Sequence, residues 1–365
     1  MTAQPGGGNA LPGGGAALTG AVTAQAGSAQ AGGVVTIGET MALMSSRGYG
    51  PLPHSPGLDL GIGGAESNVA IGVRRLGVPA TWIGKVGRDP LGDLVIREIS
   101  AEGVTVAATR DEQASTALMI KERRTASRTS VWYYRTGHAG SRLHADEIDP
   151  ALIERASVLH VTGISLALSD TLADTIMQTV AVARAAGVTV SFDLNFRGKL
   201  WSRSDASAAY RRILPLCDLV FAGDDEAAIA LGRDVPAAAA PLDPAAPLDL
   251  AAPLDPEAPL DLAARLADLG PRQAVIKLGA RGAVARIDGT AYEQPAFPIA
   301  PVDTVGAGDA FVAGYLAELV AGAGVEQRLT TAARAGAYAC LSEGDWEGLP
   351  RREELADLEA ADVAR

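Results

Sequence analysis

Short β-rich runs and longer segments with helical periodicity alternate along most of this 365-residue chain. Buried strands are predicted at 34–38, 81–83, 158–161, 188–194, 219–222 and 274–277. Helices are predicted at about 66–76, 91–102, 170–186, 205–213, 224–232, 262–269, 309–321 and 327–342. Strands that alternate with helices of this length form a mostly parallel sheet whose two faces are both covered. The sequence therefore predicts an α/β fold with helices on both faces of the sheet.

Two segments, 39–62 and 115–136, break this alternation, because they lack a helical pattern but show strand alternation. Residues 129–135 are the clearest example. One interpretation is an antiparallel edge on the main sheet. The other is a small β-sheet lid over the carboxyl ends of the parallel strands, where α/β proteins bind their ligands.

Two further stretches are expected to lie outside the compact fold. Residues 1–33 are almost all Gly, Ala, Gln, Thr, Pro and Ser, without the basic start and apolar run of a secretory signal. This composition buries too little surface to offset the entropy cost of ordering, so we predict a disordered tail before a domain at 34–365. Ala-Pro-Leu-Asp recurs at 240, 246, 252 and 258, and its prolines argue against a regular helix. A stacked repeat is the alternative, but we expect a low-complexity surface loop at about 234–261.

Composition excludes several classes of protein. The net charge of −12 argues against a nucleic-acid binder, which needs a basic surface. Cys217 and Cys340 are too few and too far apart for a disulfide framework or a zinc site, and the four histidines show no metal-ligand spacing. No run approaches the roughly 18–20 apolar residues of a membrane span. We therefore expect a cytoplasmic protein that binds neither nucleic acid nor membrane.

Three common ligand-binding motifs are absent. The Gly-Lys pairs at 84–85 and 198–199 are not followed by Ser or Thr, so the phosphate-binding P-loop is missing. The run 61–66 fails the dinucleotide Gly-x-Gly-x-x-Gly at its last position, and 163–167 misses the nucleophile elbow of serine hydrolases by one glycine. A dehydrogenase and a serine hydrolase are therefore disfavoured.

The strongest chemical signal is Val-Asp-Thr-Val-Gly-Ala-Gly-Asp-Ala-Phe at 302–311, which leads into an apolar helix. Gly306, Ala307 and Gly308 offer backbone N–H groups that attract anions at a helix start. A carboxylate at Asp309 makes sense if it takes a proton from a hydroxyl while these amides stabilise a transferring phosphoryl group. The alternative is that Asp309 only caps the helix. Spacing alone does not choose between them.

Two other runs that follow predicted strands are weaker candidates for ligand-binding sites. Gly64, in the run 63–70, could act as a hinge below the lid, and the Asn68 side chain could bind sugar hydroxyls. The alternative is a plain turn with a polar first helical turn. The run 277–282 is a tight turn that could pass beneath a nucleotide or form only a hairpin.

Three cationic or aromatic side chains indicate a way to bind an acid. Arg197 follows the strand 188–194 and suits a carboxylate, although it could instead pair with a nearby acid. Tyr133 and Arg135 share one face of a strand. If that face points inward, they add a hydroxyl and a second cation to the site; otherwise Arg135 is a solvated charge.

Together these runs resemble the two signatures of the ribokinase-like (PfkB) sugar kinases, Gly63-Gly64-Ala65-x-x-Asn68 and Asp303-Thr304-x-Gly306-Ala307-Gly308-Asp309. The resemblance covers about 34–355 and is specific, because both runs occur in this order and at this distance. Within the family the chain is most similar to 2-keto-3-deoxygluconate kinases. The supporting runs are Tyr133-Tyr134-Arg135, Asp193-x-Asn195-x-Arg197 followed by Leu200-Trp201, and Gly344-Asp345-Trp346-Glu347-Gly348.

The resemblance implies a Rossmann-like domain with a β lid that transfers the γ-phosphate of ATP, with Mg²⁺, to a primary hydroxyl. It implies that Asp309 is the base, that Gly306 to Asp309 form the anion hole, and that Glu226 acts indirectly on the metal. It also implies a substrate site made by Gly64, Asn68, Tyr133, Arg135 and Arg197, and a nucleotide site made by Lys277, Gly279, Gly282 and Gly308.

Three positions depart from the family pattern. The family's Asn-x-x-Glu motif reads Gly223-Asp224-Asp225-Glu226 here, which puts metal positioning in doubt unless Asp224 substitutes in part. A lid position that is often Tyr is Met119, and a position near the adenine that is commonly Asn is Ala333. None of these changes affects the base or the anion hole.

We therefore predict ATP-dependent phosphorylation of a sugar acid, 2-keto-3-deoxygluconate to its 6-phosphate, with Arg135 and Arg197 holding the carboxylate. A fructokinase or another neutral-sugar kinase is the first alternative, although it would not need two cations. A non-catalytic sugar-binding regulator on the same fold is the second, although residues 306–309 are intact. The resemblance also implies a homodimer or higher homo-oligomer formed through the lid.

Overall fold

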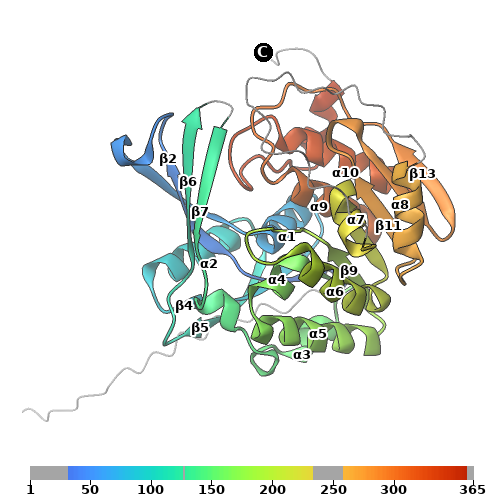
Figure 1. Ribbon diagram of the computed structural model, residues 1–365, viewed down its shortest axis with the longest axis horizontal. Helices are drawn as coiled ribbons and strands as arrows, with labels where there is room; N and C mark the ends of the chain where they lie inside the picture. Colours follow the sequence, from blue (N-terminus) through green and yellow to red (C-terminus); the bar gives the residue numbers. More distant parts are fainter. Residues whose placement is uncertain (1–31, 126–127, 233–257, 360–365) are drawn as a thin grey trace, which may run out of the picture.

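The structure is a computed structural model that describes residues 32–125, 128–232 and 258–359. Its centre is a nine-stranded sheet in the order β13-β12-β11-β10-β9-β8-β1-β4-β5 (Figure 1). The seven strands β11, β10, β9, β8, β1, β4 and β5 run parallel to one another. Strands β12 and β13 form an antiparallel edge beside β11. The bounds are β1 Val34–Ile37, β4 Ala80–Gly87, β5 Thr105–Asp111, β8 Val158–Thr162, β9 Thr189–Asp193, β10 Leu219–Gly223, β11 Gln273–Lys277, β12 Ala283–Ile287 and β13 Thr290–Gln294.

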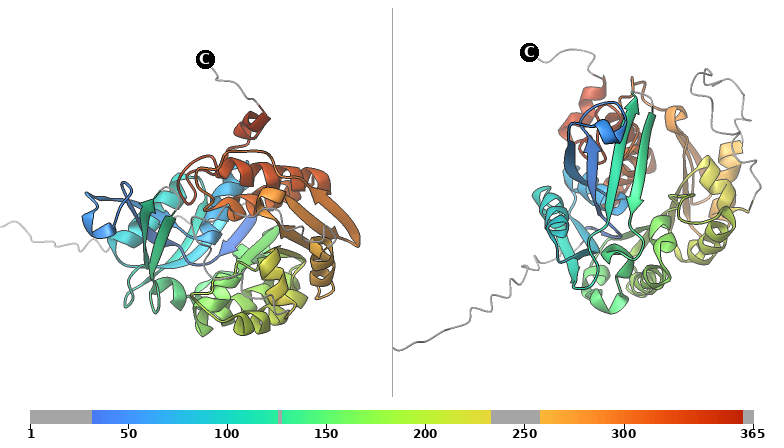
Figure 2. Two further views of the ribbon diagram at one scale, coloured as in Figure 1. Left: turned by 45° about the horizontal axis from the view of Figure 1, so that its top comes forward. Right: turned by 60° about the vertical axis from the view of Figure 1, so that its left-hand side comes forward.

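Helices cover both faces of this sheet, as the alternating pattern predicted (Figure 2). Each face has its own hydrophobic core, and strand residues alternate between the two: Phe221 faces one core, and its neighbours Val220 and Ala222 face the other. The first core is covered by α1 Ala65–Arg75, α2 Pro90–Ala101, α9 Ala307–Val320 and α10 Val325–Ala339. The second is covered by α3 Pro150–Glu154, α4 Gly163–Leu168, α5 Asp170–Ala185, α6 Arg203–Ile213, α7 Asp224–Ala230 and α8 Ala258–Ala267. No helix in the described ranges is long and apolar enough to cross a bilayer.

The two segments without helical pattern form a separate four-stranded sheet, in the order β3-β2-β6-β7, which we call the lid. Its strands are β2 Met41–Ser46, β3 Leu58–Gly63, β6 Leu118–Thr125 and β7 Arg128–Tyr134. They pair with one another and not with the main sheet, and they rise beside it in Figure 1. The lid interpretation is therefore confirmed, and the interpretation as an edge of the main sheet is wrong. That edge is made by β12 and β13, which the helix-strand alternation did not predict.

Some boundaries differ from the predicted ones. Helix α8 begins at Ala258, so the last Ala-Pro-Leu-Asp copy opens a helix and does not belong to a loop ending at 261. Pro259 is tolerated there because the first helical turn needs no N–H donor. Residues 1–31 of the predicted tail 1–33, and 233–257, which include the rest of the repeat, lie outside the described residues. Gly32 and Gly33 belong to the fold and not to a tail, because their backbone groups hydrogen-bond with Arg155 and Ser157. Short 3₁₀ turns occupy Leu52–His54, Ala139–Arg142, Ala145–Glu147, Leu214–Leu216, Gly279–Arg281 and Glu353–Glu359.

Helices α1 and α9 pack closely against one another in the first core. A Cβ atom on Gly72 of α1 would lie 2.6 Å from the Cβ of Ala313 on α9, so only glycine permits this approach without a shift. Asn68 lies one turn before Gly72, and Asp309 lies one turn before Ala313. The packing of these two helices therefore brings Asn68 and Asp309 together.

Candidate active site

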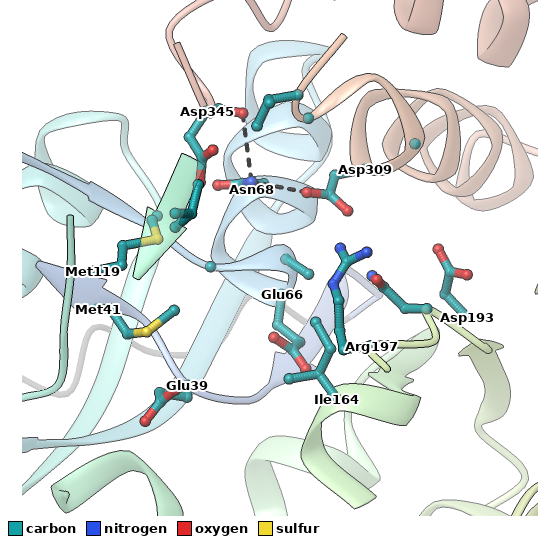
Figure 3. A pocket seen from close by; sticks show the side chains of 18 of the residues that line it. Glu39, Met41, Glu66, Asn68, Met119, Ile164, Asp193, Arg197, Asp309 and Asp345 are labelled. Atoms are coloured by element: carbon teal, nitrogen blue, oxygen red, sulfur yellow. Dashed lines mark hydrogen bonds between the residues drawn. The ribbon is translucent and has the colours of Figure 1, made fainter. Parts of the chain in front are cut away.

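A cavity of about 520 Å³ lies between the carboxyl ends of the parallel strands, the start of α9 and the inner face of the lid (Figure 3). All the side chains predicted to bind substrate line it, and so do most of those predicted for phosphoryl transfer. These residues are Gly64, Asn68, Tyr133, Arg135, Arg197, Gly306, Gly308 and Asp309. The inward-facing interpretation of Tyr133 and Arg135 is thus the one that the structure shows.

Asp309 does not cap its helix. Helix α9 begins at Ala307, and Gly306 at its N-cap adopts a left-handed φ of 75°. Asp309 lies within the first turn, where Asn68 Nδ2 donates a hydrogen bond of 2.8 Å to its Oδ2. Figure 3 shows the two side chains pointing toward one another. Asn68 was predicted to bind sugar hydroxyls, whereas in this structure its amide orients the Asp309 carboxylate.

The surroundings of Asp309 suit a group that exchanges a proton near neutral pH. Burial, opposed by the hydrogen bond from Asn68, raises the pKa of Asp309 to about 6. The negative charge of Asp193 acts in the same direction as burial, and the cations Arg197 and Lys277 act against it. A carboxylate with this pKa is charged at neutral pH and still accepts a proton readily.

A second cavity of about 570 Å³ adjoins the first and is mostly apolar. Lys277, Thr304 and Gly308 line both cavities, so the two meet at the start of α9. The residues predicted to bind a nucleotide, Lys277, Gly279, Gly282 and Gly308, all line this second cavity. Ala307 and Ala333, the residue at the position that is commonly Asn in the family, line it as well. The turn 277–282 joins the antiparallel strands β11 and β12, so it is both a hairpin and part of this cavity.

Lys277 stands at the junction as a fixed cation. Its Nζ lies 2.7 Å from Oδ2 of Asp193, whose side chain is 2% exposed. Burial alone would lower the pKa of Lys277, but the charges of Asp193 and Glu226 more than offset it and raise that pKa. A cation is therefore held where the two cavities meet.

Four cationic side chains line the first cavity, and three of them are paired with carboxylates. Arg135 donates from Nε (2.8 Å) and Nη2 (2.6 Å) to Oε2 of Glu39. Lys277 is paired with Asp193, and Lys121 with Asp303. The side chain of Arg197 makes no hydrogen bond or ion pair with any residue in the described part of the chain, although its backbone carbonyl accepts a hydrogen bond from the N–H of Leu200. Arg135 is thus paired with Glu39, just after β1, and differs in this from Arg197; its role in holding a substrate carboxylate stays a prediction.

This geometry agrees with what comparison with known proteins shows. Residues 32–352 match the family model of the pfkB family carbohydrate kinases. The chain belongs to that family. A 2-dehydro-3-deoxygalactonokinase from Haloferax volcanii is 36% identical over 315 residues, covering 86% of this chain and 92% of the relative. A 2-dehydro-3-deoxygluconokinase from Bacillus subtilis is 32% identical over 337 residues, covering 90% and 95%. The solved 2-dehydro-3-deoxygluconokinase of Thermotoga maritima has a TM-score of 0.78 at 25% identity, covering 90% of this chain and 98% of its own.

These matches make the protein an ATP-dependent sugar kinase. The regulator alternative has no support in the site, because Asp309, the start of α9 and Lys277 all line the cavity. We call residues 303–308, which lead into α9, the α9 turn.

The kinase uses Glu226 to hold its backbone in place. The two carboxylate oxygens of Glu226 accept hydrogen bonds from the N–H groups of Phe196 (2.8 Å) and Gly223 (2.7 Å). Asp224 was predicted to substitute in part for the missing Asn, but it pairs with Arg281 and does not line the cavity. Among the described residues no cluster of three His, Cys, Asp or Glu could hold a metal. Glu226 thus shapes the end of β9 and the start of α7.

Two acidic residues of the site, Asp345 and Glu66, belong to the sequence runs that carry the family resemblance, but no role was predicted for them. Asp345 lines the cavity, and burial together with the charge of Asp309 raises its pKa to about 7. Glu66 is fully buried, and its Oε1 accepts hydrogen bonds from the hydroxyls of Thr162 (2.7 Å) and Ser165 (2.9 Å). Burial raises the pKa of Glu66, and its Oε2 has no partner in the described structure. Glu66 lies within the run 63–68 and Asp345 within the run 344–348, and this position in the family runs was the sequence signal that could have identified them as site residues.

The raised pKa of Asp309 predicts a measurable effect on stability. Asp309 binds its proton more tightly in the folded state, with a pKa of about 6, than in the unfolded chain, where the ordinary pKa is 3.8. The free energy of unfolding therefore falls as the pH rises from about 3.8 to about 6. Asp309→Asn should therefore raise Tm, and the gain should be larger at about pH 7.5 than at about pH 4.5. Scanning calorimetry at both pH values measures it, with the exposed Asp146→Asn as control. An equal or smaller gain at the higher pH would contradict the raised pKa.

Proposed function

We propose that this kinase transfers the γ-phosphate of ATP to the primary hydroxyl of a 2-keto-3-deoxy sugar acid, such as 2-keto-3-deoxygluconate. The observation that carries the proposal is Arg197, an unpaired cation in the same cavity as Asp309. An arginine without a carboxylate partner in a partly buried cavity is suited to bind a carboxylate from the substrate. Two of the similar proteins are named as kinases of such acids, which supports the same class.

The chemistry follows from the placement of Asp309. The acceptor hydroxyl gives its proton to the Asp309 carboxylate while its oxygen forms a bond to the γ-phosphorus. The bond from that phosphorus to the β,γ-bridging oxygen breaks, and the electron pair remains on the leaving ADP. Asn68 keeps Asp309 oriented through its 2.8 Å hydrogen bond. The amides of Gly306, Ala307 and Gly308 and the Lys277 ammonium stabilise the negative charge of the transferring group.

The second cavity fits the nucleotide. Its polar end carries Lys277 and Gly308 of the α9 turn, and its far end is apolar, with Phe297, Ala333 and Ala337 among the lining residues. Phosphates would bind at the polar end, and the base would bind at the apolar end. Mg²⁺ bound to ATP would offset phosphate charge, held mainly by phosphate and water oxygens. Glu226 contributes indirectly, because it fixes the backbone at Phe196 and Gly223.

The acceptor would lie in the part of the first cavity that is lined by Arg197, Tyr133 and Gly64. Arg197 binds the carboxylate, while Tyr133, in the lid, and Gly64, at the N-cap of α1, bound the space for the carbon chain. The paired Arg135–Glu39 side chains present a polar wall with less net charge than a free arginine. Met119 adds an apolar contact where the family often has a hydroxyl.

Substrate preference should therefore depend on Arg197. We expect the wild-type kcat/KM to be higher for 2-keto-3-deoxygluconate or its galacto epimer than for fructose or ribose. Arg197→Met should lower kcat/KM for the sugar acid by about 10- to 100-fold, the range for a hydrogen bond to a charged group, with little effect on neutral sugars. A coupled assay of ADP formation measures this, with Arg184→Met, which does not line the cavity, as control.

A wild-type preference for fructose would favour the neutral-sugar alternative. It would overturn the role of Arg197 while leaving Asp309 untested.

We also propose that two copies of the kinase associate through the outer face of the lid. Leu60, Met44, Ile120 and Trp132 lie in one cross-strand row on that face, with register pairs across all four strands. Leu60 is 53% exposed and Trp132 is 43% exposed. A continuous apolar row of this kind is rarely left in water. A second copy would bury it against the same row of its partner.

The charge variant Trp132→Glu should therefore shift the protein toward monomer, because a buried carboxylate without a partner is unfavourable. Light scattering after gel filtration measures the mass. Leu341→Glu, an exposed apolar position outside the lid, is the control and should leave the mass unchanged. A monomeric wild type, or a Trp132→Glu variant that remains a dimer, would contradict the proposal.

A cytoplasmic location is proposed as well. Both cysteines, Cys217 and Cys340, are free thiols in the structure, as expected in a reducing compartment. The donor ATP is available there. Fractionation of cells that produce the protein tests this; recovery outside the cytoplasm would contradict it.

A further inference from the structure

Lys121 and Asp303 join the lid to the α9 turn. Lys121 lies on β6, and its Nζ is 2.8 Å from Oδ2 of Asp303, the first residue of that turn. The two side chains are 9% and 20% exposed, so water and salt screen this ion pair much less than a surface pair. Asp303 belongs to the signature run 303–309, but its pairing with Lys121 could not be predicted from that run.

The Asp303 carboxylate holds backbone as well as the lysine. Its Oδ1 accepts a hydrogen bond of 3.1 Å from the N–H of Val305, inside the α9 turn. The N–H of Gly344 donates to the same carboxylate. Burial opposes ionisation, but Lys121 and these donors lower the pKa of Asp303, so it is charged at neutral pH. The lid, the α9 turn and the loop at 341–348 therefore meet at one carboxylate.

The α9 turn leaves little room for adjustment. Gly306 has a left-handed φ of 75°, and a Cβ atom there would lie 2.1 Å from the carbonyl oxygen of Asp345. Asp303 is three residues before Gly306, and its contacts with Val305 and Gly344 lie on either side of that close approach. A movement of the Asp303 carboxylate would therefore move the amides that face the phosphoryl group.

We propose that Lys121 is a positioning residue for phosphoryl transfer, because its ion pair with Asp303 makes the placement of the α9 turn depend on the lid lying over the cavity. When the lid is in place, Lys121 fixes Asp303 and with it the amides of Gly306 to Gly308. When the lid moves away, the Asp303 carboxylate loses its cation and keeps only the backbone donors Val305 and Gly344. The inference rests on the proposed function and adds a coupling between lid and anion hole.

A second ion pair between lid and body provides the matched control. Arg123, two residues along β6, pairs with Glu343 in the loop at 341–348. These side chains are 25% and 48% exposed, and neither belongs to the α9 turn. Loss of this pair should loosen the lid without directly releasing the turn.

The first arm of the test is kinetic. Lys121→Met should lower kcat by about 10- to 100-fold, the effect of misplacing groups around a reacting centre, while KM for ATP changes less than about twofold. Lys121→Arg should restore most of the activity, because it keeps the charge. Arg123→Met should keep kcat within about threefold of wild type, because the α9 turn keeps its lysine. Equal losses of kcat in Lys121→Met and Arg123→Met would overturn the proposal.

The second arm needs no substrate. Hydrogen exchange followed by mass spectrometry should show faster exchange in Lys121→Met both in β6 and in the α9 turn. In Arg123→Met, exchange should rise in β6 alone. Unchanged exchange of the α9 turn in Lys121→Met would overturn the coupling. Because this arm uses the free protein, it distinguishes failure of the coupling from failure of the proposed substrate.

A double variant separates positioning from direct binding of substrate. If Lys121 acts through Asp303, then Asp303→Asn should reproduce the loss of kcat, and the double variant should be no worse than the poorer single variant. If Lys121 instead contacts the sugar acid, Lys121→Met should raise KM for the acid and Asp303→Asn should not. The latter result would overturn the proposal.

Discussion

A carboxylate that must accept a proton in a site shielded from water depends on the groups that keep it ionised and oriented. In the proposed mechanism that carboxylate is Asp309, whose pKa is raised to about 6 by burial, which one hydrogen bond from Asn68 and nearby cations oppose. The two residues are 241 positions apart in the sequence and belong to different helices. They meet because α1 and α9 pack closely at Gly72 and Ala313. Both helices lie on the same face of the parallel sheet, so the fold sets the geometry of the base.

The remaining charges of the site are arranged in pairs around this centre. Lys277 is held by Asp193 between the two cavities, Arg135 by Glu39 beneath the lid, and Lys121 by Asp303 at the α9 turn. Each pair fixes a cation without leaving it free to bind a stray anion. The side chain of Arg197 is the exception, and our proposal of a sugar-acid substrate rests on it. The contrast between three paired cations and one unpaired cation therefore says more about which group could bind the substrate than the number of cations does.

The sequence predicted the parallel sheet, the lid and the residues that line the cavity, because these depend on local periodicity and contiguous signatures. It did not predict the carboxylates that pair with the cations. Glu39 and Arg135 are 96 residues apart, and Lys121 and Asp303 are 182 apart, so neither contact leaves a local pattern. The antiparallel edge was missed although a signal was present. Asp288 and Gly289 both have positive φ, and Asp-Gly is a common tight turn between hairpin strands such as β12 and β13.

The central claim is that Asp309 takes the proton of the acceptor hydroxyl. Its most direct test is the turnover of Asp309→Asn with saturating ATP and sugar acid, together with calorimetric binding of ATP to the same variant. The account predicts that kcat falls by at least about 100-fold, the contribution expected of a positioned base, while the Kd of ATP stays within about twofold of wild type. A variant that binds ATP normally and turns over at a near-normal rate would contradict the assignment of Asp309 as the base.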